Sequence, residues 1–300
     1  MPTLKEIKGR IASVRSTLKI TSAMKLVSSA KLRKAQNAIE AMRPYQEQLQ
    51  GILASLRGGS ATQKADFMAL GPKTIVAIAS NSSLCGGFNA NAVARVRAIR
   101  QPGDTVYAIG RKMADAMRKD GFASPEDLSA LSEHPSYGPA AALVEKLVAD
   151  VEAGRTGAVV LVYNHFVSTA RQEPVVEVLA QRRSVEEGEE SLSSTSLRDP
   201  VRANVPERDS SPSPSDNAHI IEPSRMELLA ALLPKTQKLK LYAALLDSAA
   251  AEHAARTVAM QTATDNAENL LAELTLQYNK GRQQKITSEI LDLAGGQAEN

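Results

Sequence analysis

The 300-residue chain has no tryptophan and few other aromatic residues, since four Phe and six Tyr make up only 3% of it. A compact globular core usually contains several aromatic side chains, because each buries a large apolar area. Hydrophobic residues nevertheless account for 43% of the chain, which excludes an intrinsically disordered protein. A core built mainly from Ala, Val, Leu and Ile indicates extended helix contacts with closely approaching backbones.

Cysteine is equally scarce. Cys85 is the single cysteine, which excludes an intramolecular disulfide and a cysteine zinc cluster. The N-terminal segment MPTLKEIKGR is charged and lacks the apolar stretch of a signal peptide. No apolar run approaches the roughly 18 residues of a membrane-spanning helix. We therefore expect a protein of a reducing compartment that is soluble, or at most peripheral to a membrane.

The net charge of +3 is unevenly distributed. Residues 1–43 contain ten Lys and Arg against two Glu, a net charge of +8, which favours an acidic partner. Residues 184–217 contain eight acids against three Arg, a net charge of −5, together with nine Ser and four Pro. Such a segment buries too little apolar surface to offset its ordering entropy. It predicts a flexible, disordered acidic insertion, with a phosphorylated regulatory segment as the alternative.

The first 57 residues predict a helix that would be roughly 80 Å long at ~1.5 Å per residue. An apolar stripe with helical spacing passes through Ile7, Ile11, Val14 and Leu18, and it continues with a small rotation through Ile20, Met24 and Val27. Proline removes a backbone hydrogen bond, so Pro44 is expected to kink or end this helix.

The last section of the chain has the most regular pattern. Its residues alternate in steps of three and four: Leu239, Tyr242, Leu246, Ala249, His253, Arg256, Met260, Ala263, Ala267, Leu270 and Leu274. This is the spacing of coiled-coil core positions, where a polar residue such as His253 fixes the register. Ser224 and Glu227 predict a capping box before it. Pro234 is expected to separate a short helix from the long one, and Gly281 to mark a weak point.

Each terminal helix would expose its apolar stripe if it stood alone, and most helical stability in proteins comes from packing. The two stripes are the simplest partners for each other, which predicts an antiparallel coiled coil of the N- and C-terminal helices. The alternative is that each helix packs separately on a globular body.

Between the helices lies a different pattern. Short apolar runs at 74–79, 104–109 and 158–163 alternate with helical stretches near 89–100, 111–119 and 139–152. Strand and helix alternation of this kind predicts a central Rossmann-like α/β domain with a parallel sheet. A further strand is expected at about 174–180.

A search for catalytic chemistry finds little. The four histidines are scattered, and no two have metal-ligand spacing on one helix. Residues 80–89 follow a strand and precede a helix, where phosphates often bind, but they lack the lysine of a Walker motif and the dinucleotide spacing. Gly86 and Gly87 are expected to allow a tight turn and close helix packing. We therefore expect no catalytic residue, no metal and no cofactor.

Several long motifs resemble the gamma subunit of the rotary (F-type) ATP synthase. They are KITSAMKLVSSAKLR at 19–33, LCGGFN at 84–89, IEPS at 221–224, EHAARTVAMQTATDN at 252–266 and YNKGRQQKIT at 278–287. The resemblance covers the whole chain except roughly 184–217. It implies the fold class α+α/β, with an N-terminal coiled-coil helix at 1–57, a central α/β domain at 70–221 and a C-terminal coiled-coil helix at 222–294.

The resemblance also implies a function. Gamma subunits form the central stalk, or rotor shaft, inside a ring of alternating alpha and beta subunits that hold the nucleotide sites. The foot of the shaft attaches to the epsilon subunit and the membrane c-ring, and proton flow turns it. The chain is therefore expected to be a non-catalytic subunit that transmits torque and regulates ATPase activity and proton flow. It would be a peripheral membrane protein on the cytoplasmic face of the bacterial inner membrane, with no direct membrane insertion.

By the same resemblance, seven residues are expected to contact the catalytic beta subunits. Lys19, Thr21, Met24 and Lys25 would lie near an acidic loop of the beta subunit, and Arg282, Gln283 and Thr287 near its upper region. The chain departs from the family at Ser22, where a lysine is common, and at 81–83, where Asn-Ser-Ser replaces Asp-Arg-Gly. The second departure puts the contacts of that loop in question.

Two rival classes of function stay open at this point. A nucleotide-binding enzyme would use the central sheet and predicts saturable binding of ATP or NAD. A coiled-coil protein that binds nucleic acid would use the basic N-terminal helix and predicts salt-dependent retention of DNA. Against it, the chain has no aromatic residue before Tyr45 on which single-stranded bases could stack, so we expect no nucleic-acid partner.

Overall fold

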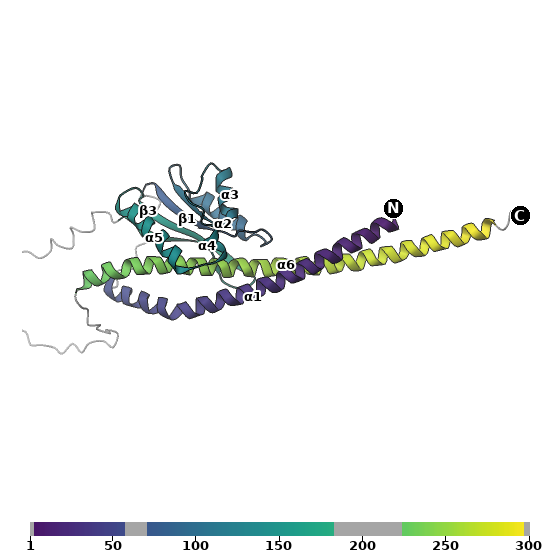
Figure 1. Cartoon of the computed structure of the whole chain (residues 1–300), viewed down its shortest axis with the longest axis horizontal. Helices are drawn as coiled ribbons and strands as arrows, with labels where there is room; N and C mark the ends of the chain where they lie inside the picture. The colour runs from purple at the N-terminus through teal and green to yellow at the C-terminus, as the bar shows by residue number, and fades with distance from the viewer. Residues whose placement is uncertain (1–2, 58–70, 183–223, 297–300) are drawn as a thin grey trace, which may run out of the picture.

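The computed structural model describes residues 3–57, 71–182 and 224–296. The chain forms an elongated two-helix rod with an α/β head on one side (Figure 1). Helices α1 (Leu4–Arg57) and α6 (Arg225–Gly296) make the rod. Within the described ranges, no helix is both long enough and apolar enough to cross a membrane. The acidic insertion predicted at 184–217 lies outside the described residues.

Helix α1 begins with a capping box that the sequence analysis did not identify. The Glu6 N–H donates to Thr3 Oγ1 at 3.3 Å, and the Thr3 N–H donates to Glu6 Oε2 at 3.0 Å. The helix then runs for 54 residues, with Pro44 inside it. Pro44 therefore does not end the helix, because its exposed position lets water reach the carbonyl that loses its partner.

The buried face of α1 keeps a strict spacing of three and four residues. Its fully buried members are Ile7, Ile11, Thr21, Ser28, Leu32, Leu49, Leu53 and Leu56. Ile20 and Val27 are each 57% exposed, so the prediction that the stripe rotates through them is wrong. The same spacing of three and four continues after Leu18, so the polar side chains of Thr21 and Ser28, rather than apolar ones, lie on the inner face.

Helix α6 contains 72 residues, which corresponds to roughly 110 Å. It passes through Pro234 without a break, so the predicted separate short helix does not exist. Pro234 is exposed, as Pro44 is, and packing of the following turns holds the helix together. The predicted capping box is half formed: Ser224 Oγ accepts a hydrogen bond from the Glu227 N–H at 3.2 Å.

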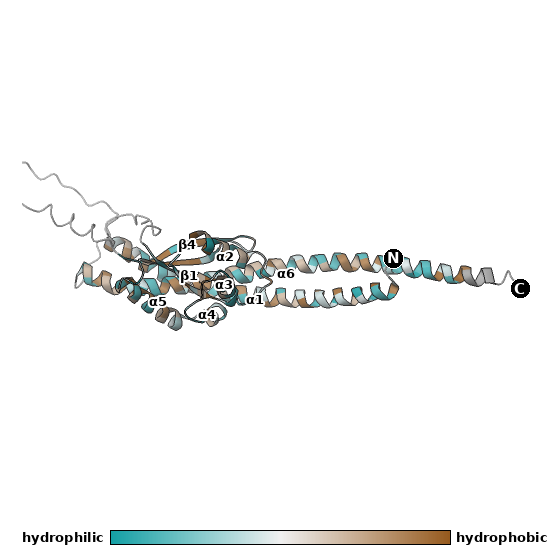
Figure 2. Ribbon diagram, turned by 90° about the horizontal axis from the view of Figure 1, so that it is seen from above, coloured by the Kyte–Doolittle hydropathy of each residue, from teal (hydrophilic) through white to brown (hydrophobic). Residues whose placement is uncertain are grey.

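The two terminal helices lie side by side in opposite directions, which confirms the predicted antiparallel coiled coil (Figures 1 and 2). Near the start of α1, Ile11 packs with Leu274 of α6. Farther along, Leu32 packs with Ala250. Helix α6 continues alone beyond the N-terminus of α1, so the end of the rod is a single helix (Figure 1).

The head contains a four-stranded sheet in the order β2-β1-β3-β4. Strands β1 (Lys73–Ile78), β2 (Thr105–Ile109) and β3 (Ala158–Phe166) are parallel, and β4 (Gln172–Gln181) pairs antiparallel with β3. Its helices are α2 (Phe88–Ile99), α3 (Arg111–Lys119), α4 (Ser129–Glu133) and α5 (Tyr137–Glu152). The Rossmann-like α/β domain is therefore confirmed, with an antiparallel edge strand added by a hairpin.

The two faces of the sheet are covered differently. Helices α2 and α3 pack on one face, where Val160 and Val162 of β3 belong to one apolar cluster with residues of both helices. Helix α5 packs on the other face together with α6, whose Leu241 and Leu245 join the same core cluster as Leu161 of β3. Because α6 belongs both to the rod and to the core of the head, the head is fixed on the rod by apolar packing.

A buried ion pair joins the first two strands. The side chains of Lys73 and Asp104 are 0% and 1% exposed, and Lys73 Nζ lies 3.0 Å from Asp104 Oδ2 without the angle of a hydrogen bond. Asp104 also accepts hydrogen bonds from the backbone N–H groups of Lys73 and Gln101. The carboxylate thus fixes the turn before β2 against the start of β1.

Gly281 lies inside α6, where the first turn of α1 rests on it. A Cβ atom at this position would come within 3.1 Å of Leu4 Cδ2, the end of a flexible side chain. We expect Gly281→Ala to raise the free energy of unfolding by up to about 1 kcal/mol, because alanine favours the helix and Leu4 can move. Gly281→Leu should instead separate the helices and lower it. Urea unfolding of both variants tests this, and equal destabilisation by both would contradict it.

Candidate functional site

The predicted contact residues of α1 do not all point the same way. Lys19 is exposed, and Met24 and Lys25 are half-buried at the edge of the helix pair. Thr21 is only 8% exposed and faces α6, where its Oγ1 accepts a hydrogen bond from Thr264. The structure therefore brings Lys19, Met24 and Lys25 to the surface and turns Thr21 inward.

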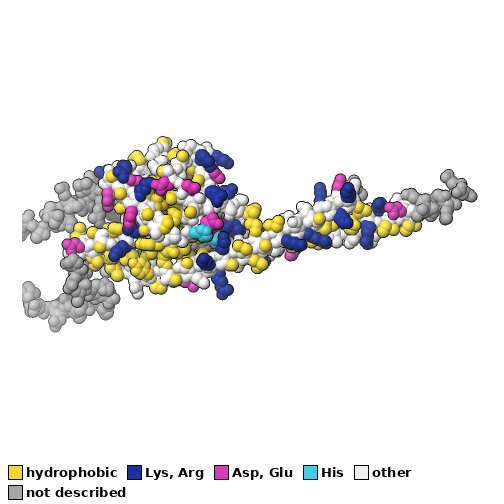
Figure 3. All heavy atoms as spheres, viewed as in Figure 1, with side chains coloured by type: hydrophobic (Ala, Val, Ile, Leu, Met, Phe, Trp, Pro, Cys, Tyr) yellow, Lys and Arg dark blue, Asp and Glu magenta, His cyan; other side chains and the backbone are white. Residues whose placement is uncertain are grey.

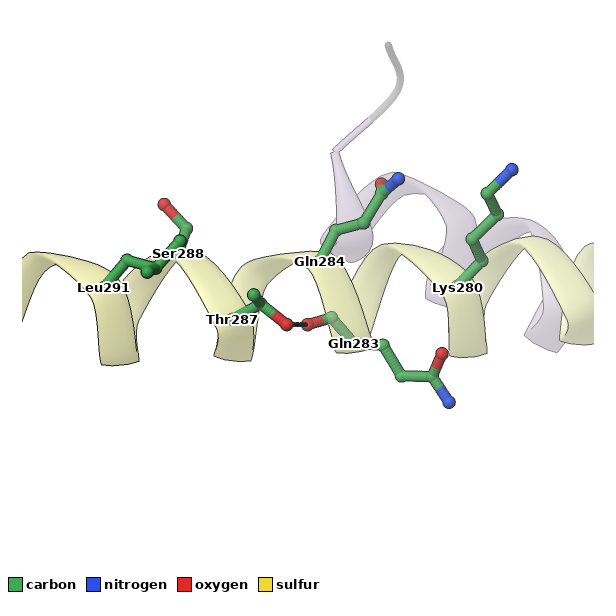
Figure 4. A pocket seen from close by; sticks show the side chains of 6 residues that line it. All are labelled: Lys280, Gln283, Gln284, Thr287, Ser288 and Leu291. Carbon is green, nitrogen blue, oxygen red and sulfur yellow. Dashed lines mark hydrogen bonds between the residues drawn. The ribbon is translucent and has the colours of Figure 1, made fainter.

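The three predicted contact residues of α6 lie toward its C-terminal end, where the first turn of α1 still lies beside Gly281 (Figure 4). Arg282, Gln283 and Thr287 are exposed, and the Thr287 hydroxyl donates to the Gln283 carbonyl of its own helix at 2.9 Å. A shallow hollow on this end is lined by Lys280, Gln283, Gln284, Thr287, Ser288 and Leu291 (Figure 4). Side chains from a single helix cannot enclose a small molecule. This end is suited to contact with a larger surface.

On the face drawn in Figure 3, the charged side chains that the rod carries beyond the head are mostly basic. Figure 3 shows Lys and Arg side chains along this part of the molecule, with few acidic side chains among them. The N-terminal basic segment identified in the sequence thus forms one arm of the rod. An acidic surface that surrounds the rod would be attracted to it.

The loop between β1 and α2 is occupied by its own hydrogen bonds. Asn89 Oδ1 accepts from both the backbone N–H and the hydroxyl of Ser80. Leu84 and Gly86 adopt positive φ angles of 67° and 57°, which form the tight turn. The turn predicted at Gly86 is confirmed, whereas Gly87 has an ordinary φ of −81° and room for a Cβ atom.

Arg256 connects this loop to the rod. Its Nη2 donates to Ser82 Oγ at 2.9 Å, and its Nη1 donates to Glu252 Oε1 at 2.6 Å. The side chains of Arg256 and Glu252 are only 8% and 11% exposed, and burial raises the Glu252 pKa although Arg256 opposes the shift. Arg256 was predicted to lie on the coiled-coil stripe, and that prediction is wrong, because Arg256 faces the head.

Other residues of the predicted stripe also face a different way from the one expected. Thr264 and Leu271 face α1, whereas Ala263 is half-buried beside the contact and Leu270 is 45% exposed. Two sets of α6 residues, offset by one position, have the spacing of three and four, and the sequence pattern does not show which set faces α1.

A second polar contact fixes the end of β3 on α6. Asp247 accepts hydrogen bonds from the Phe166 N–H at 2.9 Å and from the imidazole of His165. Burial raises the Asp247 pKa, although His165 opposes the shift. The sequence analysis missed His165 and Asp247, because a pair 82 residues apart leaves no local signal.

His253 lies at the helix interface beside Arg256. Its Nδ1 is buried without a hydrogen-bond partner among the described residues. Burial, with help from Arg256 and Lys31, lowers the pKa of His253 to about 4. The imidazole is therefore neutral in the folded chain at neutral pH, and it contributes a buried polar group rather than a charge.

This shift predicts acid sensitivity. Between pH 6.5 and 4, His253 binds a proton in the unfolded chain but stays neutral in the folded chain. Because protonation then favours the unfolded state, the free energy of unfolding falls as the pH is lowered through this range. The loss attributable to His253 should reach up to about 3 kcal/mol. Urea unfolding of wild type and His253→Gln at pH 7.5 and 4.5 measures it. Glu252 is present in both proteins, so parallel pH profiles would contradict the assignment.

The fold and these contacts define a class of protein: a long two-helix rod with an α/β head docked on it by buried apolar and polar contacts. In residues 3–57, 71–182 and 224–296, no cluster of His, Cys, Asp and Glu is suited to a metal ion. The family model described as ATP synthase matches residues 3–298. ATP synthase gamma chains of Phocaeicola vulgatus and Bacteroides fragilis are each 43% identical over 99% of both chains. The chain therefore belongs to the family of ATP synthase gamma chains, the central-stalk subunits of the rotary ATP synthase.

Solved structures agree with this fold. The rotor of the mitochondrial ATP synthase of Euglena gracilis matches with a TM-score of 0.63 at 19% identity, covering 94% of this chain and 98% of that one. The central stalk and c-ring structure of the Tetrahymena thermophila enzyme matches with a TM-score of 0.54 at 19% identity, covering 81% and 99%. At this identity the likeness supports the fold alone.

Proposed function

We propose that this chain is the non-catalytic rotor shaft of a proton-translocating ATP synthase. It transmits torque between the membrane c-ring and the alpha/beta ring, and so regulates ATPase activity and proton flow. The observation that carries the proposal is the 72-residue helix α6, which is held by α1 and by the head over most of its length and ends as a single exposed helix. Such a helix connects the wide part of the molecule, which carries the head, to its narrow end (Figure 1).

The partners follow from the same proposal. The alpha and beta subunits would surround the rod, and the epsilon subunit and c-ring would hold its foot. The structurally similar central stalk of Tetrahymena thermophila was solved together with its c-ring, which supports the last of these partners. The bacterial gamma chains similar to this one favour a peripheral position on the cytoplasmic face of the inner membrane. We also propose three parts of the chain: an N-terminal coiled-coil helix at 1–57, a central α/β domain at 70–221 and a C-terminal coiled-coil helix at 222–294.

The proposed contact residues take different roles. Lys19 and Lys25 supply positive charge for an acidic loop of the beta subunit, and Met24 supplies apolar contact. Thr21 supports this surface from inside through its hydrogen bond with Thr264. Arg282, Gln283 and Thr287 contact the upper region of the beta subunits, since their exposed side chains have no globular core to serve.

Co-expression with the alpha and beta subunits tests the proposal. The chain should purify with both in one complex that hydrolyses ATP. Recovery of the folded chain alone, from cells in which the other subunits are also soluble, would overturn it. Titration of the isolated chain with labelled ATP, NAD and DNA tests the rival functions. Saturable micromolar binding of a nucleotide would favour an enzyme, and salt-dependent DNA retention would favour a nucleic-acid binder.

Reversing the charge of Lys19 and Lys25 should impair coupling more than assembly. We expect the Lys19→Glu, Lys25→Glu variant to form the complex but to lose about tenfold in ATP-driven proton pumping, because like charges would face the acidic loop. The matched control is Lys5→Glu, Lys8→Glu, which makes the same charge change about four turns nearer the N-terminus. Unchanged pumping in the first variant would remove these lysines from the mechanism.

A further inference from the structure

A short polar layer interrupts the apolar contact between the two helices of the rod. Thr21 and Lys25 of α1 and Gln261 and Thr264 of α6 form this layer. On one side of it Ile7, Ile11 and Leu274 form an apolar cluster, and on the other Leu32, Ala250 and Ala254 form another. Thr21 and Thr264 are therefore buried between the helices, away from a frayed end, whereas Lys25 and Gln261 meet at the exposed edge of the contact.

The members of the layer pair across the helices. Thr264 Oγ1 donates to Thr21 Oγ1 at 3.0 Å, and the two residues are 5% and 8% exposed. The Thr264 hydroxyl also lies 2.8 Å from the Met260 carbonyl, so its single proton is shared between the two acceptors. Beside this pair, Lys25 Nζ donates to Gln261 Oε1 at 2.8 Å.

Apolar side chains are available at this level but point outward. Ile20, Leu26 and Val27 are 57%, 68% and 57% exposed, whereas Thr21 faces the partner helix. The usual amphipathic pattern of a packed helix is thus inverted over this stretch. A polar residue at a core position of a coiled coil specifies the register and lowers stability.

The apolar positions alone do not distinguish one register from another. In the observed alignment Thr21 faces Thr264, and Ile11 packs with Leu274. A slip of one heptad would bring Ile11 beside Ala267, which is also buried, so apolar packing would be partly kept. The same slip would place Thr264 against Val14, so the hydrogen bond between Thr264 and Thr21 would be lost.

We infer that this polar layer is a register lock: it selects one alignment of the two helices at a cost in the stability of these turns. The inference concerns the chain by itself and does not depend on the proposed function. In this view the layer determines which alignment the two helices adopt and does not add to their stability.

Disulfide trapping tests the specifying role in a Cys85→Ser full-length background. The pair Ile11→Cys, Leu274→Cys reports the observed alignment, and Ile11→Cys, Ala267→Cys reports the slipped one. With the native layer, only the first pair should oxidise. After Thr21→Val, Lys25→Leu, Gln261→Leu and Thr264→Val together, the slipped pair should oxidise at least about tenfold more than before, because the polar contribution that opposes the slip is gone. The inference would be overturned if the slipped pair oxidised while the native layer is present, or if it failed to oxidise after the layer has been made apolar.

Hydrogen exchange provides a second test that needs no cysteine pair. The amides of 261–265 in the Thr21→Val, Thr264→Val variant should exchange about tenfold more slowly than in the unchanged chain, because apolar packing replaces a shared hydrogen bond. The amides of 271–274 serve as the internal reference and should not change. Equal or faster exchange at 261–265 in the variant would contradict the weak-turn assignment.

Discussion

Replacing Arg256 with alanine is expected to lower the free energy of unfolding by about 3–5 kcal/mol, because it leaves a buried carboxylate without its cation. Glu252 has Arg256 as its hydrogen-bonded partner, and both side chains are about nine-tenths buried. The same change removes the hydrogen bond to Ser82 Oγ, which is the polar contact between this loop of the head and α6. The variant should therefore lose head docking as well as stability.

Two measurements separate these effects. Urea unfolding of the full chain gives the loss of stability, and proteolysis in native buffer reports loosening of the 80–89 loop. The control is Glu252→Gln with Arg256→Met, which removes both charges and should recover most of the stability without the contact to Ser82. If Arg256→Ala unfolded at the same urea concentration as wild type, the pair would be a surface contact and the assignment would fail.

Removing the carboxylate of Asp104 should have a comparable effect on the head. Asp104→Ala leaves the Lys73 ammonium buried with no opposite charge within reach among the described residues, and it deletes two hydrogen bonds to backbone N–H groups. We expect a loss of about 3–5 kcal/mol from the uncompensated charge. Because the pair joins the starts of β1 and β2, hydrogen exchange in both strands should accelerate together.

The matched controls for Asp104 are an isosteric change and a paired one. Asp104→Asn keeps an oxygen acceptor for the Lys73 N–H but removes the charge, so it should lie between wild type and Asp104→Ala. Lys73→Met with Asp104→Leu removes both buried charges and should restore much of the stability. A full loss in this double variant would show that the backbone hydrogen bonds, and not the ion pair, hold the turn.

Much of the fold follows from patterns that are local in the sequence. The apolar runs that become β1, β2 and β3 are bounded by turn residues, and the spacing of three and four in the terminal segments is specific to helices. Pairing of the two ends follows because neither apolar stripe can stay exposed. Those predictions needed no knowledge of distant contacts, and the structure confirms them.

The predictions that were wrong depended on contacts between distant segments. Arg256 has coiled-coil spacing, but its side chain faces Ser82, which is 174 residues away. Ile20 has the apolar character of an inner position, yet the rod places Thr21 inside, where Thr264 satisfies its hydroxyl. Pro44 and Pro234 are signals of helix ends that packing on both sides overrides. Spacing alone does not show which of two neighbouring helix faces meets which partner.

The candidate site was predictable only to the level of its position. Family motifs in the sequence predict it on two segments of the rod, around Lys19 and around Arg282, and this stays a prediction. The contacts that support the rod from within, between Asp247 and His165 and between Arg256 and Ser82, appear only when α6 is packed on the head.

The central claim is that this chain turns as a shaft inside a ring of partner subunits. The most direct measurement fixes the alpha/beta ring to a surface, attaches a bead to a cysteine at Lys119 on the exposed side of α3 in a Cys85→Ser chain, and adds ATP. The account predicts that the bead turns in one direction and stops when ATP is removed. A bead that stays still while the same complexes hydrolyse ATP would contradict it.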